Sequence, residues 1–440
     1  MIRLALRSFA HHRAAAVTTG LVAMVGTALV TAMAGLLGTG LSSDTAVGDR
    51  DFLVQFPLIL GGWVLAIVVF AMVSTIGVAL QGRAGEIAGI RLVGATPSQV
   101  RRMVVAETAA VAAVAAVPGL GGGQLLGAGL LAGIRGTGLI DDATGYFPGA
   151  ALPLIGAALM LGASIAAAWI GSRAIASRSP VDDPSPTRVH GRTARARPIA
   201  AISLLVAGLA SSFPVIAIDP DDILTTALTG PGCVLVAVGL SLLAPELITV
   251  AEFVFGKIPA LRAGPAGHLT ALNLAAAPER VRPAVTFLTL FIGVAAGTLS
   301  MQGIENQYGA EGGDGQLLAA INYLVVVLIA AFMAIALSNN LVASIARRRT
   351  EFASMHLIGA TATQSRRMLI GEATAAVTVS AVAGGLGAFA STAPFAITKT
   401  GNPLAALAPL PYLLSVMAGA IITLSVTALA GRRVINTATA

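Results

Sequence analysis

Residues 82–107 read GRAGEIAGIRLVGATPSQVRRMVVAE, and residues 347–372 read RRRTEFASMHLIGATATQSRRMLIGE. Aligned without a gap, the two stretches share one glutamate early, a Gly-Ala-Thr triplet, a glutamine, an Arg-Arg-Met triplet and a last glutamate. Each stretch lies between two long apolar runs, in the same orientation. Because self-similarity of this kind reveals a repeated structural unit, we predict a chain built from two parallel copies of one module.

The first part of each copy predicts a short amphipathic helix at a membrane surface. In the first copy, apolar residues recur at helical spacing (Ile87, Ile90 and Val93), and we expect Arg83 and Arg91 to face water. Gly94 should end this helix, since glycine tolerates left-handed backbone geometry. Thr96 and Gln99 then have the spacing of a capping box, which starts the next helix at Pro97. Thr361 and Gln364 repeat the box.

The composition places most of the chain in a bilayer. Of its 440 residues, 56% are hydrophobic and 11% are charged, whereas a soluble domain carries about 25% charged residues. A span needs about 20 mostly apolar residues. On that criterion we predict an all-α, polytopic transmembrane protein with about ten spans, at residues 14–41, 57–81, 103–133, 150–172, 199–218, 225–251, 284–303, 317–345, 368–393 and 409–431. The end of the 225–251 span is interrupted by Pro245 and Glu246.

The distribution of charges predicts the topology. Arginines cluster in every second loop, while the alternate loops hold many acidic residues and only Arg50, Arg135 and Lys399 as cations. Since Lys and Arg are enriched in cytoplasmic loops, we expect both termini in the cytoplasm. The loops on the opposite side are all shorter than about 17 residues, too short for a folded domain. The net charge of +7 is therefore a topology signal, and we expect no nucleic acid as a partner.

These features suggest a division of the chain. We expect a first span with its outer loop at residues 1–56, a first module at 57–176, a cytoplasmic linker rich in Pro, Ser and Arg at 177–198, two spans at 199–256, a cytoplasmic segment with one span at 257–316, and a second module at 317–433. A looser similarity joins residues 4–17 to residues 272–285, each an arginine-bearing lead into a span.

Few groups could carry chemistry. His11 and His12 lack further ligands, so we expect no metal site. Neither paired catalytic carboxylates nor a Ser-His-Asp grouping is evident. Glu107 and Glu372 end the two repeats near the membrane, where carboxylates are functional candidates. Two interpretations stay open: a local partner for Arg102 or Arg367 near a helix N-terminus, or a contact between the modules that reports coupling.

The repeated stretch resembles the signature of the FtsX-like permease family, the membrane subunits of one class of ABC transporters. The first copy carries Glu86-Ile87, Arg91, Val93-Gly94-Ala95-Thr96, Gln99-Val100 and Glu107, and the second departs from the signature at Phe352 and His356. Ten spans resemble the bacitracin-exporter-type permeases, which act in antibiotic resistance, without their large extracellular domain. The resemblance implies a multi-pass protein of the bacterial cytoplasmic membrane.

The resemblance also implies a mechanism. The short helices would be coupling helices that dock on two copies of a separate P-loop ABC ATPase, which would hold the ATP and Mg, while this chain binds no cofactor and is not an enzyme. The only Gly-Lys pair, Gly256-Lys257, is followed by Ile258, so the chain lacks a P-loop. The implied coupling residues are Arg83, Glu86, Ile87, Ile90, Arg91, Gly94, Ala95, Thr96, Gln99, Arg348, Glu351, Phe352, Met355, His356, Gly359, Ala360, Thr361 and Gln364.

We therefore expect a type VII-like permease subunit that exports a small amphipathic or lipophilic compound or extracts it from the membrane. One alternative is an ATPase-driven signalling or regulatory scaffold, although the short outer loops leave little protein for an outside partner. The other alternative is a secondary transporter with parallel repeats, which usually needs ionisable groups near the midplane.

Overall fold

The computed structural model describes residues 13–81, 83–136, 138, 140–176, 192–222, 224–256, 264–308 and 313–439. Within these ranges the chain is helical, with turns and no strand, which confirms the predicted all-α class. The chain forms two compact units. Unit 1 comprises Met1–Ser185 and Glu311–Phe332, and unit 2 comprises Pro186–Ala310 and Met333–Ala440. Each unit is described separately below.

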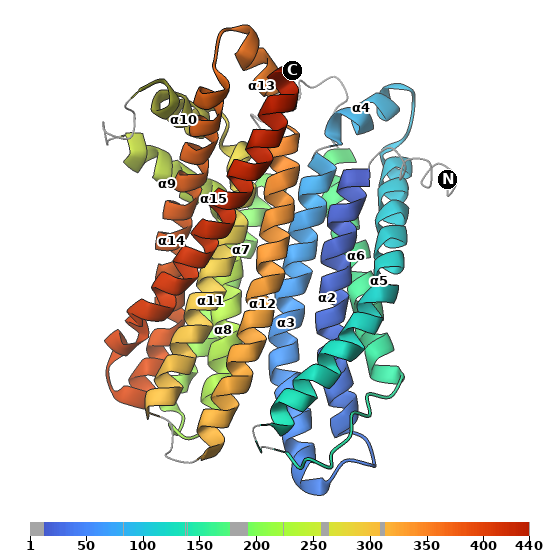
Figure 1. The fold of residues 1–440 in the computed structure, drawn as a ribbon, viewed down its shortest axis with the longest axis vertical. Helices are drawn as coiled ribbons and strands as arrows, with labels where there is room; N and C mark the ends of the chain where they lie inside the picture. The colour runs from blue at the N-terminus through green and yellow to red at the C-terminus, as the bar shows by residue number, and fades with distance from the viewer. Residues whose placement is uncertain are drawn as a thin grey trace. The chain divides into compact units, whose positions relative to one another are not determined.

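Unit 1 is a bundle around its first described helix. It contains α2 (Arg13–Gly40), α3 (Val47–Gln81), α4 (Ala84–Leu92), α5 (Pro97–Arg135) and α6 (Ala151–Ala176), together with the first part of α12 (Gly313–Ala346). Helix α2 packs against α3, α5 and α6, and its most extensive contact is with α5 (Figure 1). Short α4 connects the end of α3 to the start of α5.

Unit 2 is arranged around α11. Its elements are α7 (Arg192–Ser212), η1 (Phe213–Ala217), α8 (Leu224–Leu242), α9 (Ala244–Gly256), α10 (Gly264–Ala276), η3 (Pro278–Arg280), α11 (Arg282–Tyr308), the end of α12, α13 (Arg349–Leu357), α14 (Ala362–Thr400), η4 (Pro403–Leu407) and α15 (Pro409–Thr439). Helix α11 packs most extensively on α14 and also contacts α8 and α15. It is therefore the central helix of its unit, as α2 is in unit 1.

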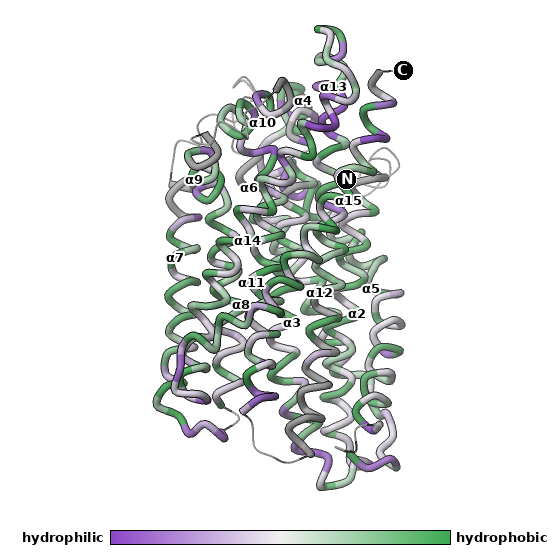
Figure 2. The backbone as a smooth tube through the Cα atoms, turned by 60° about the vertical axis from the view of Figure 1, so that its left-hand side comes forward, coloured by the Kyte–Doolittle hydropathy of each residue, from purple (hydrophilic) through white to green (hydrophobic). Residues whose placement is uncertain are grey.

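The long helices meet the requirements for crossing a membrane. By length and composition, nine helices in the described ranges could span a bilayer. The number rises to ten if the part of α12 from Ala330 onward and α13 are counted together as one span with a bend of 41°. Hydrophobic residues occupy the middle of these helices and hydrophilic residues gather near their ends (Figure 2). Many apolar side chains of α5 and α15 remain exposed, such as Leu125 and Leu410. Lipid contact explains this exposure, since water would disfavour it.

One predicted span differs from the structure. The 225–251 run is two helices, because α8 ends at Leu242 and α9 begins at Ala244. Pro245 lacks the backbone N–H that would continue the ladder, and its ring hinders the preceding turn. A single helix through residue 251 was therefore the wrong prediction for the end of this span.

The glycine-rich stretches of α5 and α14 allow close helix packing. A Cβ atom at Gly123 of α5 would lie 2.8 Å from the carbonyl oxygen of Ala28 on α2. A Cβ atom at Gly384 of α14 would lie 3.0 Å from the backbone nitrogen of Gly293 on α11. The same small-residue contact thus joins α5 to α2 and α14 to α11. Each repeat therefore extends to the helix that precedes the predicted module.

Candidate functional site: two clamped surface helices

The predicted surface helices are present in both repeats. In unit 1, α4 begins after Arg83 and ends before Gly94, whose φ of +105° only glycine adopts easily. In unit 2, α13 begins after Arg348 and ends before Gly359, with a φ of +95°. A side chain at either glycine would strain the backbone although no neighbouring atom lies within 4 Å. The tight turn after each helix is therefore set by backbone geometry.

Both capping boxes are confirmed. The backbone nitrogen of Gln99 donates to Thr96 Oγ1 over 3.3 Å, and the nitrogen of Thr96 donates to Gln99 Oε1 over 2.9 Å. Thr361 and Gln364 make the same pair of bonds over 3.2 and 2.8 Å. The reciprocal bonds satisfy two backbone donors that the helix itself cannot. The start of α5 and of α14 is thereby fixed to the preceding turn.

The buried face of each surface helix is narrower than the sequence predicted. Ile87 is 2% exposed, as expected, and Ile90 is partly buried, but Val93 is 91% exposed. Val93 lies beyond the last residue of α4, where the chain turns away. The prediction that Val93 shares the buried face was therefore wrong, because the helical periodicity stops one residue earlier.

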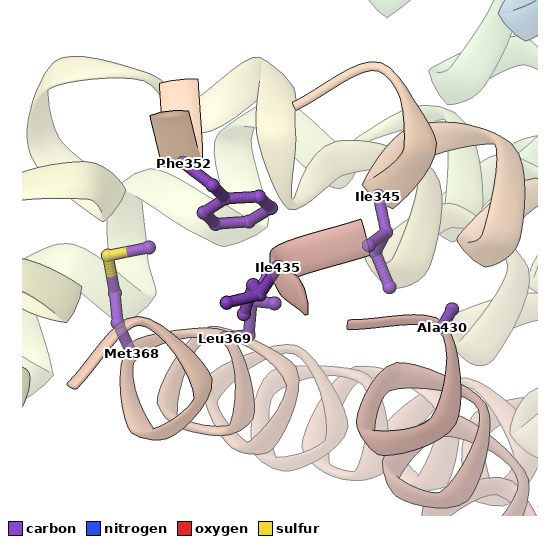
Figure 3. Packing of buried hydrophobic residues seen from close by; sticks show 6 residues of the cluster. All are labelled: Ile345, Phe352, Met368, Leu369, Ala430 and Ile435. Atoms are coloured by element: carbon purple, nitrogen blue, oxygen red, sulfur yellow. The ribbon is translucent and has the colours of Figure 1, made fainter. Parts of the chain in front are cut away.

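Phe352 holds α13 to unit 2. Its ring, 1% exposed, packs in a cluster with residues from α12, α14 and α15, namely Ile345, Met368, Leu369, Ala430 and Ile435 (Figure 3). Met355 is partly buried against the same cluster. Phe352 replaces the isoleucine of the first copy, and its larger apolar surface gives α13 the stronger apolar anchor. The departure from the family signature thus has a packing role.

A buried ion pair clamps α4 to α5. Arg83 Nη1 donates to Glu107 Oε2 over 2.7 Å, and Arg83 Nε donates to Glu86 Oε2 over 3.2 Å. The side chains of Arg83 and Glu107 are only 11% and 8% exposed. Arg83 therefore does not face water as predicted. The partner of Glu107 is Arg83 and not Arg102, because the chain reverses between α4 and α5 and brings residues 24 apart into contact.

The same clamp in unit 2 belongs to a closed ring of side chains. Arg348 donates to Glu372 on α14, over 3.1 Å from Nη2 to Oε1, and its Nε donates to Glu351 Oε2 over 3.1 Å. Glu372 also accepts a 2.6 Å bond from Asn273 Nδ2 of α10. Arg280 closes the ring, because its Nη1 donates to Asn273 Oδ1 and lies 2.9 Å from Glu351 Oε1. Arg367, the predicted local partner of Glu372, has no part in this ring.

The clamps keep both arginines charged. Burial by itself would lower the pKa of Arg83, but the hydrogen bonds and charges of Glu107 and Glu86 raise it above its ordinary value. Burial likewise acts to lower the pKa of Arg348, and the charges and hydrogen bonds of Glu372 and Glu351 raise it. Each guanidinium therefore remains a fixed cation that joins the first turn of a surface helix to the next long helix.

Beyond its clamp, each surface helix exposes two consecutive apolar residues. Leu92 and Val93 are 65% and 91% exposed, and Leu357 and Ile358 are 87% and 85% exposed. We call these two pairs the apolar tips. Beside the first tip lies a cleft of about 510 Å³ lined by Glu86, Gly89, Ile90, Val93 and Ala95. Sequence reasoning missed the tips, although two adjacent apolar residues before a turn glycine, in both copies, are a detectable signal.

The other predicted site residues occupy the same turns. Arg91 and His356 lie in the last turns of α4 and α13, where positive charge is favoured by the helix dipole. Arg91 is half-buried, whereas His356 is exposed. Ala95 and Ala360 are both partly exposed. His11 and His12 lie outside the described residues. Among the residues that are described, no group of three or more His, Cys, Asp or Glu side chains could hold a metal ion.

Membrane-length helices, a duplicated module and two clamped surface helices define a polytopic permease-like membrane protein. The family described as FtsX-like permease C-terminal matches residues 58–180 and 323–439, more than half of the chain. The chain belongs to the FtsX-like permease family. It is accordingly a membrane permease subunit of the ABC-transporter type. The subunits of this family are generally non-catalytic and work with an ABC ATPase. The comparison with curated proteins found no significant match.

Proposed function

We propose that α4 and α13 are the two sites at which this permease subunit docks two copies of a separate P-loop ATPase. The matched apolar tips carry this proposal. Water disfavours the exposure of two adjacent apolar side chains, and burying one such side chain stabilises a contact by roughly 1.5–3 kcal/mol. A hydrophobic groove on a soluble partner is the natural place for each tip.

The clamps supply the connection from the docking site to the membrane. A force applied to α4 reaches α5 through the Arg83–Glu107 pair and the capped turn. In unit 2 it reaches α14 through Arg348–Glu372 and the apolar packing of Phe352. Closure of the ATPase dimer on ATP would therefore move long helices and not only the surface helix. This is the type VII-like mechanotransmission that the family resemblance implied.

The proposed setting is the bacterial cytoplasmic membrane with both termini in the cytoplasm. The arginine-rich loops favour this orientation. Two of the three cations that the sequence placed in the opposite loops lie within helices and have local partners. Lys399 Nζ lies 3.0 Å from Glu305 Oε1 in unit 2, and Arg50 donates to the carbonyl oxygens of Thr45 and Ser43 in unit 1. A cation that already has local partners counts less against the proposed orientation than a free cation on that side would, because the orientation is inferred from the enrichment of Lys and Arg in cytoplasmic loops.

The proposed cargo is an amphipathic or lipophilic compound that is exported or extracted from the membrane. Apolar helices and short loops favour a molecule that reaches the permease from the bilayer. ATP turnover of the reconstituted permease–ATPase complex should rise with amphipathic compounds and stay unchanged with water-soluble analogues. Stimulation by the water-soluble compounds alone would contradict this cargo class.

Docking is tested by isolating the tagged chain from its own membranes in mild detergent. We expect a P-loop ATPase, identified by sequence, at two copies per chain by native mass spectrometry. Replacing Leu92 and Val93 by serine should remove one copy, and the same change at Leu357 and Ile358 should remove the other. Val47→Ser is the matched control, because Val47 is 81% exposed but is the first residue of α3, at the end of that helix opposite to α4. Full ATPase recovery with both tips changed would refute the proposal.

A further inference from the structure

A cavity of about 390 Å³ lies between α5 and α6 in unit 1. It is lined by Ser98, Arg101, Arg102, Val105, Ala106 and Trp169. The polar lining residues belong to the first two turns of α5, and Val105 and Ala106 follow one turn further along the helix. The cavity therefore changes from cationic to apolar along the axis of a membrane-spanning helix.

The tryptophan and one arginine of this cavity are stacked. The guanidinium carbon of Arg101 lies 4.4 Å from the centre of the Trp169 ring. Trp169 is 50% exposed, so one part of the ring orients Arg101 while the rest stays open to a ligand. Tryptophan is enriched where a membrane meets water, since its ring is apolar and its N–H is polar. The pair thus marks the headgroup level of the bilayer.

Two arginines give the cavity its positive charge. In the part of unit 1 that the structure describes, neither Arg101 nor Arg102 forms an ion pair, and Arg101 Nε is buried without a hydrogen bond. The glutamates before and after these arginines in the repeat, Glu86 and Glu107, form ion pairs with Arg83. Arg173, which is exposed, adds a third cation one turn beyond Trp169 on the same face of α6. An anion is the ligand that would balance these charges.

The second repeat differs at the matched position. Arg366 corresponds to Arg101, and its Nη2 donates over 2.7 Å to Asn436 Oδ1 on α15. The guanidinium is therefore tied to its own unit, although its Nε is also buried without a partner. A ring like that of Trp169 is absent from the end of α15, where residues 429–433 read LAGRR. The open cationic cavity is thus particular to the first repeat and is not a general property of the shared motif.

We propose that this cavity binds one anionic phospholipid. Its phosphate lies between Arg101 and Arg102, which suit the bidentate geometry that guanidinium groups offer to phosphate oxygens. Its acyl chains follow Val105, Ala106 and the exposed part of Trp169 into the bilayer. A free phosphate would use the arginines but gain nothing from the apolar half of the cavity. The lipid would fasten the start of α5 to the inner leaflet next to the clamp of α4.

Brominated lipids test the proposal, because bromine quenches the fluorescence of a tryptophan that it touches. The chain has two tryptophans, so Trp63→Phe leaves Trp169 as the single reporter. The chain is placed in nanodiscs that mix unlabelled lipid with either brominated phosphatidylglycerol or brominated phosphatidylcholine. We expect phosphatidylglycerol to quench at a lower mole fraction, by roughly five-fold for each contacting arginine. Equal quenching by both lipids would overturn the proposal.

Variants test whether the preference for phosphatidylglycerol arises in the cavity. Changing Arg101 and Arg102 to glutamine should abolish the preference for phosphatidylglycerol. Changing both to lysine should keep part of it, because the positive charge remains while the bidentate geometry is lost. The lysine variant guards against a loss of preference that comes only from misfolding. Changing Arg366 and Arg367 to glutamine is the matched control and should leave the preference intact. Persistence of the preference in the Arg101 and Arg102 glutamine variant would overturn the site. If millimolar inorganic phosphate abolished the preference, free phosphate and not lipid would be the ligand. None of these readouts requires an ATPase.

Discussion

Loss of the Glu107 carboxylate should release α4 from α5. In Glu107→Gln, the shape of the side chain is kept but the buried Arg83 loses the charge that lies 2.7 Å from its Nη1. Removing one partner of a buried ion pair costs about 3–5 kcal/mol. Glu86 remains 3.2 Å from Arg83 Nε and compensates in part, so we expect the lower end, about 3 kcal/mol.

Glu86 supplies the matched comparison. It contacts the same arginine but is 38% exposed, and exposed ion pairs contribute only about 0–1 kcal/mol. Glu86→Gln should therefore lower the free energy of unfolding by less than about 1 kcal/mol. The assay is unfolding by sodium dodecyl sulfate in mixed micelles, followed by the signal of Trp63 and Trp169. Membrane insertion should be normal in both variants.

Two further measurements complete the test. A double-mutant cycle between Arg83→Gln and Glu107→Gln should show a coupling free energy within the usual range of about 0.5–3 kcal/mol for residues in contact. In the complex with its ATPase, Glu107→Gln should also reduce transport-coupled ATP turnover, because α4 would move without α5. Equal destabilisation by Glu86→Gln and Glu107→Gln, or additive behaviour in the cycle, would refute the clamp.

Three other predictions concern the same regions. Asn273→Ala should lower the free energy of unfolding by about 1–3 kcal/mol, because Glu372 and Arg280 each lose a partly buried hydrogen-bond partner. An unchanged unfolding midpoint would contradict the ring. Gly94→Ala and Gly359→Ala should each lower the free energy of unfolding by about 1–2 kcal/mol through backbone strain alone. Gly94→Asn should lower it less, since asparagine tolerates this conformation better. Equal effects of alanine and asparagine would argue against strain. Thr96→Ala should cost about 1 kcal/mol by removal of the cap, with Thr96→Ser as the conservative control, and hydrogen exchange should show faster opening of the first turn of α5.

Local features of the motif were predictable from sequence. The capping boxes depend on residues three apart, and the turns depend on the backbone freedom of Gly94 and Gly359. Helical spans follow from apolar length because a backbone in lipid must satisfy its own hydrogen bonds. The gapless repeat also placed Glu107 and Glu372 at equivalent points. Each of these inferences uses neighbours in the chain or a property of the whole composition.

The partners of the charged residues required the tertiary structure. Arg83 and Glu107 are 24 residues apart, whereas a prediction from neighbouring sequence proposed the much nearer Arg102 as the partner. Asn273 reaches Glu372 across 99 residues, and its amide carries no signal in a sequence pattern. The exposure of Val93 depended on where α4 ends. The helix ends at Leu92, one residue before the last position of the apolar pattern.

The duplicated module and its membrane setting were therefore determined by the sequence itself, because apolar length, caps and turns are short-range properties of the chain. Only the tertiary structure decided that the repeated arginine is a buried clamp, that the repeated carboxylate is its partner, and that Leu92-Val93 and Leu357-Ile358 remain exposed. The physical reason is that burial and ion pairing depend on which helices fold against one another, and that arrangement brings together residues that no local pattern connects.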